Sequence, residues 1–179
     1  SGPPIVCYEY QLGRDGKYPE RFLKGFAGLL HADGWNAYDK VTDVTLIGCW
    51  AHARRKFVDA LLVVPKEHRK DPSLLANIAI VKIKRLYKIE KEFRDATPDE
   101  RLAARNERSR PIVDDIKAWL ESESKLALPK SKIGEAIKYC LNQWPRLIRF
   151  LDDGRLELDN NRAEHSIKPF VIGRKNWLF

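Results

Sequence analysis

The chain has 179 residues, of which 44% are hydrophobic and 32% charged, and its formal net charge at pH 7 is +8. This size and composition suit one globular unit, or a core that carries an inserted subdomain. No apolar run is long enough to cross a bilayer and no charged-then-apolar leader is present, so we expect no membrane partner. Three widely spaced cysteines, Cys7, Cys49 and Cys140, favour a reduced, cytoplasmic setting over a disulfide framework.

Residues 3 to about 50 alternate between strand and helix patterns. Residues 4–10, PIVCYEY, are rich in β-forming residues and predict a strand, whereas residues 19–27, PERFLKGFA, predict a short helix. Residues 28–33, GLLHAD, and 44–50, VTLIGCW, predict two further strands, the second of them buried. Strands that alternate with short helices predict a mixed α/β layer structure.

Residues 53–151 carry almost no strand signal and predict a helical insertion. Residues 97–100, TPDE, form a capping box with proline at the first helical position. Residues 129–154 predict a further helix, which Pro145 would kink and Gly154 would end. Apolar residues recur at helical spacing at Leu75, Ala79, Ile83, Leu86, Phe93, Ile112, Ile116, Trp119 and Leu120. Aromatic residues of this zone are expected in its core rather than at a binding surface: Tyr87, Trp119, Tyr139 and Trp144.

The last zone returns to α/β character. Residues 155–159, RLELD, predict a strand, and a helix is expected to begin between Asp159 and Asn161, whose short polar side chains cap backbone N–H groups well. Glu164 lies beside the apolar face of this helix, one turn before Lys168. An ordinary surface ion pair is the plain interpretation of that spacing.

Asp33 closes the predicted strand 28–33 and is followed by Gly34. An aspartate in this position can simply form a turn. It can also be a carboxylate presented at the carboxyl end of a rigid strand, a common ligand position in α/β folds. Carboxylates bind Mg²⁺ or Mn²⁺, because these hard cations prefer oxygen donors.

Cys49 and His52 form a C-x-x-H pair at the end of the next strand. One such pair cannot complete a tetrahedral zinc site, and the sequence has no second pair of that kind. A structural role is favoured, with His52 bonding across the site and Cys49 packed. His31 and His165 are also near the proposed site, but a lone histidine is weak evidence for a general base. The sequence contains no Ser-His-Asp order, Walker loop or GxGxxG motif.

Basic clusters interleaved with aromatic residues recur along the chain. They are HARRKF at 52–57, KIKRLYK at 82–88, RNERSR at 105–110 and IGRKNWLF at 172–179. Such a mixture can bind phosphates and stack on bases, so it predicts a nucleic-acid partner more specifically than the net charge does.

The segments LLHADGWNAY, IGCWAHARRKFVDA and the stretch from LPKSKIGEAIKYC to the final NWLF resemble the central part of the insertion-sequence-66 family of bacterial transposases. That family is similar to the DDE transposases and retroviral integrases. The resemblance implies an RNase H-like α/β core, a divalent-metal site of two Asp and one Glu, and an inserted domain before the Glu. Its function would be metal-dependent DNA cleavage and strand transfer.

Carried over residue by residue, the resemblance makes Asp33 the second Asp and Glu164 the Glu, both ligands of Mg²⁺ or Mn²⁺. Cys49 and His52 would correspond to a C-x-x-H signature of several transposase groups, and Asn160 and Asn161 would be structural residues near the site. The residues expected to contact DNA are Arg54, Arg55, Lys56, Arg162, Lys168, Arg174 and Lys175.

The resemblance also implies domain boundaries. Residues 3–52 and 152–179 would form the RNase H-like core, and residues 53–151 the helical insertion. The first Asp would lie on a strand before residue 3, so we expect a partial core that lacks its first strands and does not cleave DNA alone. The family's usual Glu-Arg is Glu164-His165 here, so the neighbouring contact can differ.

Three functions compete at this point. The leading one is the catalytic-core fragment of a DNA transposase that forms a homo-oligomer on its transposon ends and target. The others are a DNA-binding remnant without chemistry and a helical module that binds a protein partner. The first requires Asp33 and Glu164 to come close despite their separation in sequence.

Overall fold

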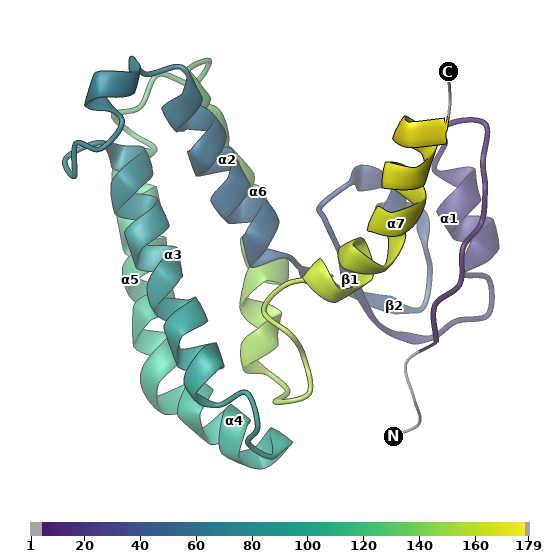
Figure 1. Ribbon diagram of the computed structural model, residues 1–179. Coiled ribbons are helices and arrows are strands. Elements are labelled where there is room, and N and C mark those ends of the chain that lie inside the picture. The colour runs from purple at the N-terminus through teal and green to yellow at the C-terminus, as the bar shows by residue number, and fades with distance from the viewer. Residues whose placement is uncertain (1–4, 178–179) are drawn as a thin grey trace.

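The computed structural model describes residues 5–177, with side chains of the last helix described through Pro169 and again at Ile172. It has two parts (Figure 1). One is a bundle of long helices, and the other combines a pair of strands with a short helix and the last helix. The chain passes between the two parts twice, near residues 49 and 159 (Figure 1).

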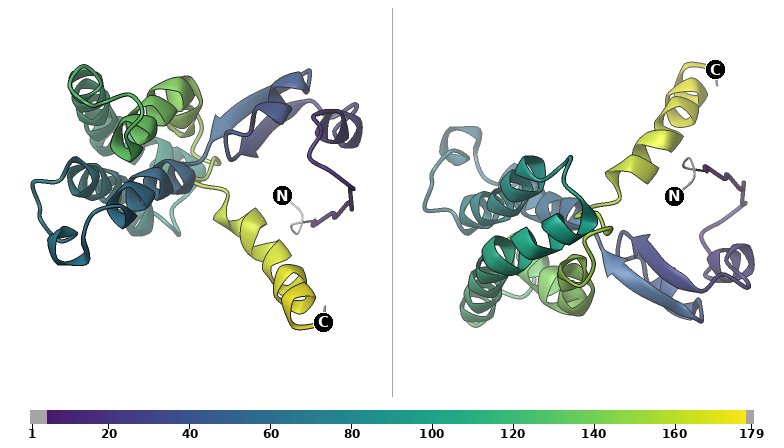
Figure 2. Two further views of the ribbon diagram at one scale, coloured as in Figure 1. Left: turned by 90° about the horizontal axis from the view of Figure 1, so that it is seen from above. Right: turned by 90° about the horizontal axis from the view of Figure 1, so that it is seen from below.

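The smaller part is built around two parallel strands. Strand β1 (Gly28–Ala32) pairs with β2 (Val44–Gly48), with Gly28 opposite Val44 and Ala32 opposite Gly48. Because the strands are parallel, their carboxyl ends meet at the same edge. The other elements of this part are α1 (Lys17–Phe22), a 3₁₀ turn (Asn36–Lys40) between the strands, and α7 (Asn161–Trp177). Figure 2 shows α7 and the strand pair diverging as they leave the bundle.

The bundle consists of α2 (Trp50–Leu62), α3 (Leu75–Glu92), α4 (Pro98–Ala104), α5 (Arg110–Glu123) and α6 (Lys132–Leu147). Short 3₁₀ turns cover Lys66–His68 and Ile148–Leu151, and a π-helical turn, Arg105–Ser109, joins α4 to α5. Helix α2 packs against α3 and α6, and α5 packs against the same two helices. No helix in the described part of the chain is both long and apolar enough to cross a membrane.

The main core lies inside the bundle. Its fully buried large side chains include Trp50, Phe57, Leu86, Ile137 and Phe150. Trp50 sits edge-on to both Trp144 and Phe150, a favoured geometry for aromatic pairs. Burial of this apolar surface, rather than helix propensity, supplies most of the stability of such helices.

The predicted helix signals largely match the structure. The Thr97 side chain accepts a hydrogen bond from the Glu100 N–H, and the Glu100 side chain accepts one from the Thr97 N–H, so the capping box is confirmed. Ser131 caps α6 in a similar way. Helix α6 runs through Pro145 but ends at Leu147, earlier than Gly154.

Two predicted strands are wrong. Residues 5–10 are extended but pair with no strand within the described chain, and Ile5 and Tyr10 are more than four-fifths exposed. Residues 155–159 form turns and loop. The alternating leucines of this loop pack on the bundle instead of forming a strand: Leu158 lies in the bundle core and Leu156 packs against it.

The fold therefore combines helices with a small parallel sheet, as an α/β prediction requires. The RNase H-like core stays a prediction, because the sheet of the described residues has two strands. The domain division also stays a prediction. Its proposed boundary after residue 52 falls inside α2, whereas the boundary after residue 151 coincides with the end of a 3₁₀ turn.

Candidate active site

Asp33 follows β1 directly and is half-buried. Its Oδ1 accepts a hydrogen bond from the Trp35 N–H at 2.9 Å, which closes a turn through Gly34, a glycine with φ of +84°. The backbone oxygen of Asp33 accepts a bond from the Tyr139 hydroxyl at 2.8 Å. Helix α6 of the bundle therefore fixes the strand end that carries Asp33.

Glu164 lies in the first turn of α7, where its N–H donates to the Asn160 oxygen at 3.1 Å. Its carboxylate faces two residues of α2. Nε2 of His52 lies 3.3 Å from Oε1, and Nη2 of Arg55 lies 3.6 Å from Oε2. The plain prediction of a surface ion pair along the helix is not what the structure shows, since the partners of Glu164 come from another helix.

Asp33 and Glu164 line the same hollow, which has a volume of about 910 Å³. Its walls come from the carboxyl end of β1, from His52 on α2, from the loop before α7 with the first turns of α7, and from residues 5–8. Residues 131 positions apart in the chain thus contribute carboxylates to one cavity.

Among the described residues, no three His, Cys, Asp or Glu side chains are grouped so that they could hold a metal ion together. Asp33 and Glu164 still offer the carboxylate oxygens that Mg²⁺ and Mn²⁺ prefer, on one cavity. The donor chemistry of these two side chains is compatible with such a cation as part of a ligand set.

Cys49 and His52 lie at the amino end of α2. Burial raises the pKa of the Cys49 thiol. Within the described chain, Nδ1 of His52 and Oδ1 of Asn160 are buried without a hydrogen-bond partner.

His31 lies on β1, where Nε2 is 2.9 Å from the oxygen of Gly48 on β2. Burial lowers its pKa, which favours the neutral ring. The side chain thus spans the strand pair at the edge where Asp33 begins. His165 is exposed on α7.

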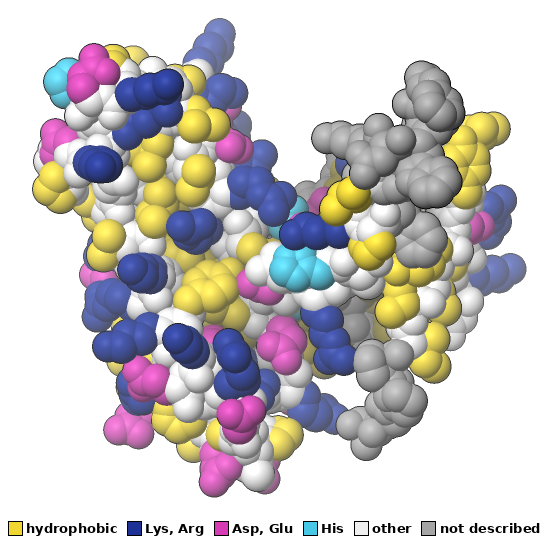
Figure 3. Space-filling view, viewed as in Figure 1, with side chains coloured by type: hydrophobic (Ala, Val, Ile, Leu, Met, Phe, Trp, Pro, Cys, Tyr) yellow, Lys and Arg dark blue, Asp and Glu magenta, His cyan; other side chains and the backbone are white. Residues whose placement is uncertain are grey.

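The predicted DNA contacts divide among several surfaces. Arg54 and Arg55 line a groove of about 580 Å³ together with Lys84 of α3. Lys56 points elsewhere, over the ring of Tyr139 at 5.3 Å. Arg162 and Lys168 are exposed on α7, and Arg162 lines the hollow of Asp33; the side chains of Arg174 and Lys175 lie outside the described residues. Lys and Arg side chains recur along the bundle face in Figure 3.

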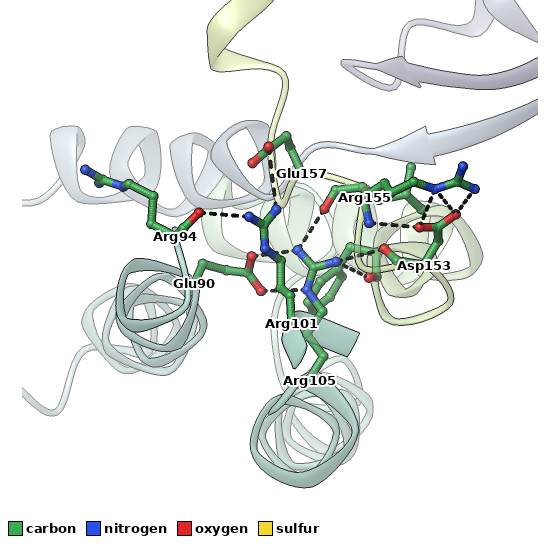
Figure 4. Close-up of polar contacts among 9 residues, drawn as sticks. Glu90, Arg94, Arg101, Arg105, Asp153, Arg155 and Glu157 are labelled. Atoms are coloured by element: carbon green, nitrogen blue, oxygen red, sulfur yellow. Dashed lines mark hydrogen bonds and ion pairs between the residues drawn. The ribbon is translucent and has the colours of Figure 1, made fainter. Parts of the chain in front are cut away.

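Sequence reasoning missed several polar contacts near the site. Tyr87 and Tyr139 were expected in the core, yet the hydroxyl of each donates to a residue beside the hollow, Asp159 and Asp33 respectively. Arg105 was expected only in a basic cluster, yet it is fully buried, and its guanidinium contacts Glu90 (Figure 4). A tyrosine or arginine at an inward helical position is the signal that could have suggested such contacts, without revealing the partner.

A family model described as Transposase IS66 family matches residues 1–179. The chain therefore belongs with the transposases. Within them, it is a member of the IS66 family. No solved structure matches the chain.

Curated relatives occur in Sinorhizobium fredii (strain NBRC 101917 / NGR234). Uncharacterized protein y4hP is 33% identical over 191 residues, covering 100% of this chain and 35% of that protein. Uncharacterized protein y4qI is 37% identical over 189 residues, covering 100% of this chain and 34% of the relative. Uncharacterized protein y4jD is 36% identical over 187 residues, covering 99% of this chain and 35% of that protein. The chain thus spans about a third of the length of these relatives.

Proposed function

We propose that the whole protein is a DNA transposase with an RNase H-like, metal-dependent catalytic core, in which Asp33 and Glu164 are two of three catalytic carboxylates. The third, an Asp, would lie outside this chain, so the chain alone does not cleave DNA. The partners would be the transposon ends and a target DNA, bound in the cytoplasm by an oligomer. The main support is the cavity that Asp33 and Glu164 share.

The residues of the site would divide the work of metal binding, positioning and DNA binding. Asp33 and Glu164 would hold Mg²⁺ or Mn²⁺, which when bound can activate a water or 3′-hydroxyl and stabilise the leaving oxygen. Tyr139 fixes the strand end at Asp33. His52, whose Nε2 lies 3.3 Å from Oε1 of Glu164, would orient the Glu164 carboxylate. Arg54, with the other exposed cations of α2 and α7, would bind DNA phosphates.

The test uses the full-length protein and a labelled duplex that carries one transposon end. Addition of Mg²⁺ should give strand cleavage, and Asp33→Asn or Glu164→Gln should each lower its rate by roughly a hundredfold or more, because each removes a metal ligand. Glu20→Gln, on the exposed side of α1, is the matched control and should cleave normally.

Cleavage that persists in both Asp33→Asn and Glu164→Gln would refute the assignment of the site. Absence of cleavage by the unaltered full-length protein, with DNA binding intact, would favour the DNA-binding remnant instead.

A further inference from the structure

The residue just before α7 connects that helix to the bundle. Oδ2 of Asp159 accepts a hydrogen bond from the Tyr87 hydroxyl on α3 at 2.8 Å, across 72 residues of sequence. The same carboxylate accepts bonds from Asn161, the first residue of α7, through its N–H at 3.0 Å and its side-chain amide at 2.7 Å. One side chain thus joins α3 to the start of α7.

The backbone around Asp159 is fixed from the side of α2. The Trp50 N–H donates to the oxygen of Leu158 at 3.1 Å. Farther back, the Arg105 guanidinium donates to the oxygens of Asp153 and Leu156 (Figure 4). The loop is therefore anchored on both sides, but Asp159 makes the side-chain contact that continues into α7.

The charge of Asp159 is favourable at its position just before α7. A carboxylate at the amino end of a helix is favoured by the partial positive charge of the free N–H groups there. Burial and the charge of Asp159 both raise the pKa of Tyr87, so its hydroxyl stays protonated and remains a donor.

We propose that Tyr87 and Asp159 are positioning residues for Glu164: the helical insertion sets the direction of the active-site helix through this hydrogen bond. The inference rests on the proposed function for Glu164 but assigns a role to two residues outside the carboxylate set. Glu164 lies one turn beyond Asn161, so a change in the entry of α7 moves the Glu164 carboxylate relative to Asp33. Catalysis is sensitive to displacements of about 1 Å.

The experiment compares full-length proteins with Tyr87→Phe, Asp159→Ala and the double substitution. Tyr10→Phe, at a tyrosine that is 82% exposed, is the matched control. Hydrogen exchange without DNA or metal should quicken at residues 161–164 in Tyr87→Phe and leave α3 and α6 unchanged. In Mg²⁺-dependent cleavage, kcat should fall about tenfold with KM for DNA unchanged, since orientation but not DNA contact is altered. The double variant should be no worse than Asp159→Ala.

Unchanged exchange at residues 161–164 in Tyr87→Phe would overturn the proposal. So would exchange that quickens equally in all helices, because Tyr87 would then act as a general packing residue. The exchange measurement needs neither DNA nor catalysis, so it decides the positioning role even if the full-length protein proves unable to cleave. Loss of cleavage in Glu164→Gln separately tests the function.

Discussion

The guanidinium of Arg105 is fully buried and makes all its contacts inside the protein (Figure 4). Nε and Nη2 donate to the Glu90 carboxylate at 2.8 and 2.6 Å. Nη1 donates to the backbone oxygens of Phe150 and Asp153, and Nη2 also donates to that of Leu156. A buried arginine offers five donors in a rigid fork, which suits an anchor for a loop of several unpaired carbonyls. Arg105 thereby joins α3, the π-helical turn and the loop that leads to α7.

Replacing Arg105 with Met should lower the free energy of unfolding by about 3–5 kcal/mol, because Glu90 and the loop carbonyls lose their partner in a buried setting. Urea unfolding followed by circular dichroism measures the change. Arg85→Met, at a surface arginine 3.6 Å from Asp115, is the control and should change stability by less than about 1 kcal/mol. Equal effects of the two substitutions would show that Arg105 is not an anchor.

Asp153, in the same loop, gives a pH-dependent prediction. The Arg155 side chain lowers the pKa of Asp153 from 3.8 to about 2 by hydrogen bonding. Because the folded-state pKa is the lower one, this carboxylate stabilises the fold above pH 3.8, and the contribution is lost as pH falls toward 2. When the pH is lowered from 5 to 3, the free energy of unfolding should therefore fall less for Asp153→Asn than for the unaltered chain. An identical pH dependence would contradict the assignment.

Among the elements, β2 approaches the end of α6 closely at Gly48. A Cβ at this position would lie 2.9 Å from the backbone nitrogen of Leu147, too close for an unshifted backbone. Gly48→Ala should therefore separate β2 from α6 and destabilise the protein by about 1–3 kcal/mol. Gly13→Ala is the control, since its Cβ would meet only the Tyr18 ring at 4.0 Å. If the melting temperatures of Gly48→Ala and Gly13→Ala differ little, the contact between β2 and α6 is not tight.

The elements also show what the sequence alone could predict. Local signals identified α3 through its apolar spacing, α4 through the Thr97 capping box and the start of α7 through its polar residues. The loop at 155–159 was misread as a strand, because alternation of Leu156 and Leu158 fits a strand equally well. Its true conformation depends on hydrogen bonds to Arg105 and Trp50, about 50 and 108 residues away in sequence, which no local pattern encodes.

For the candidate site, too, local sequence patterns predicted some features and could not predict others. The position of Asp33 after a strand and of Glu164 near a helix start followed from local pattern, and their functional roles came from the family resemblance. Their placement on one cavity depends on how α7 enters from the bundle, which is a property of tertiary structure. The hydroxyl contacts of Tyr87 and Tyr139 could not be foreseen for the same reason.

At the scale of the whole molecule, the net charge of +8 and the exposed cations of α2 predict binding to duplex DNA that weakens steeply with salt. Each phosphate contact contributes about 0.9 to the slope of log K against log salt concentration, so Arg54→Ala with Arg55→Ala should reduce the slope by nearly 2. Fluorescence anisotropy with an arbitrary duplex measures it.

The control for this prediction removes the same charge elsewhere. Lys125→Ala with Lys130→Ala, at exposed positions between α5 and α6, should leave the slope nearly unchanged. If both double variants reduce the slope equally, net charge rather than the α2 surface determines DNA binding.

Asp33 and Glu164 line one hollow, and we propose that their carboxylates hold one cation. A titration of the chain with Mn²⁺, followed by paramagnetic broadening of backbone amide signals in NMR spectra, tests it directly, because even weak binding broadens nearby signals. We expect amides around Asp33 and around Glu164 to broaden together at the same Mn²⁺ concentration, and Glu164→Gln to weaken the broadening at both places. Broadening at only one of them, or equal broadening at an exposed surface carboxylate such as Asp99, would contradict it.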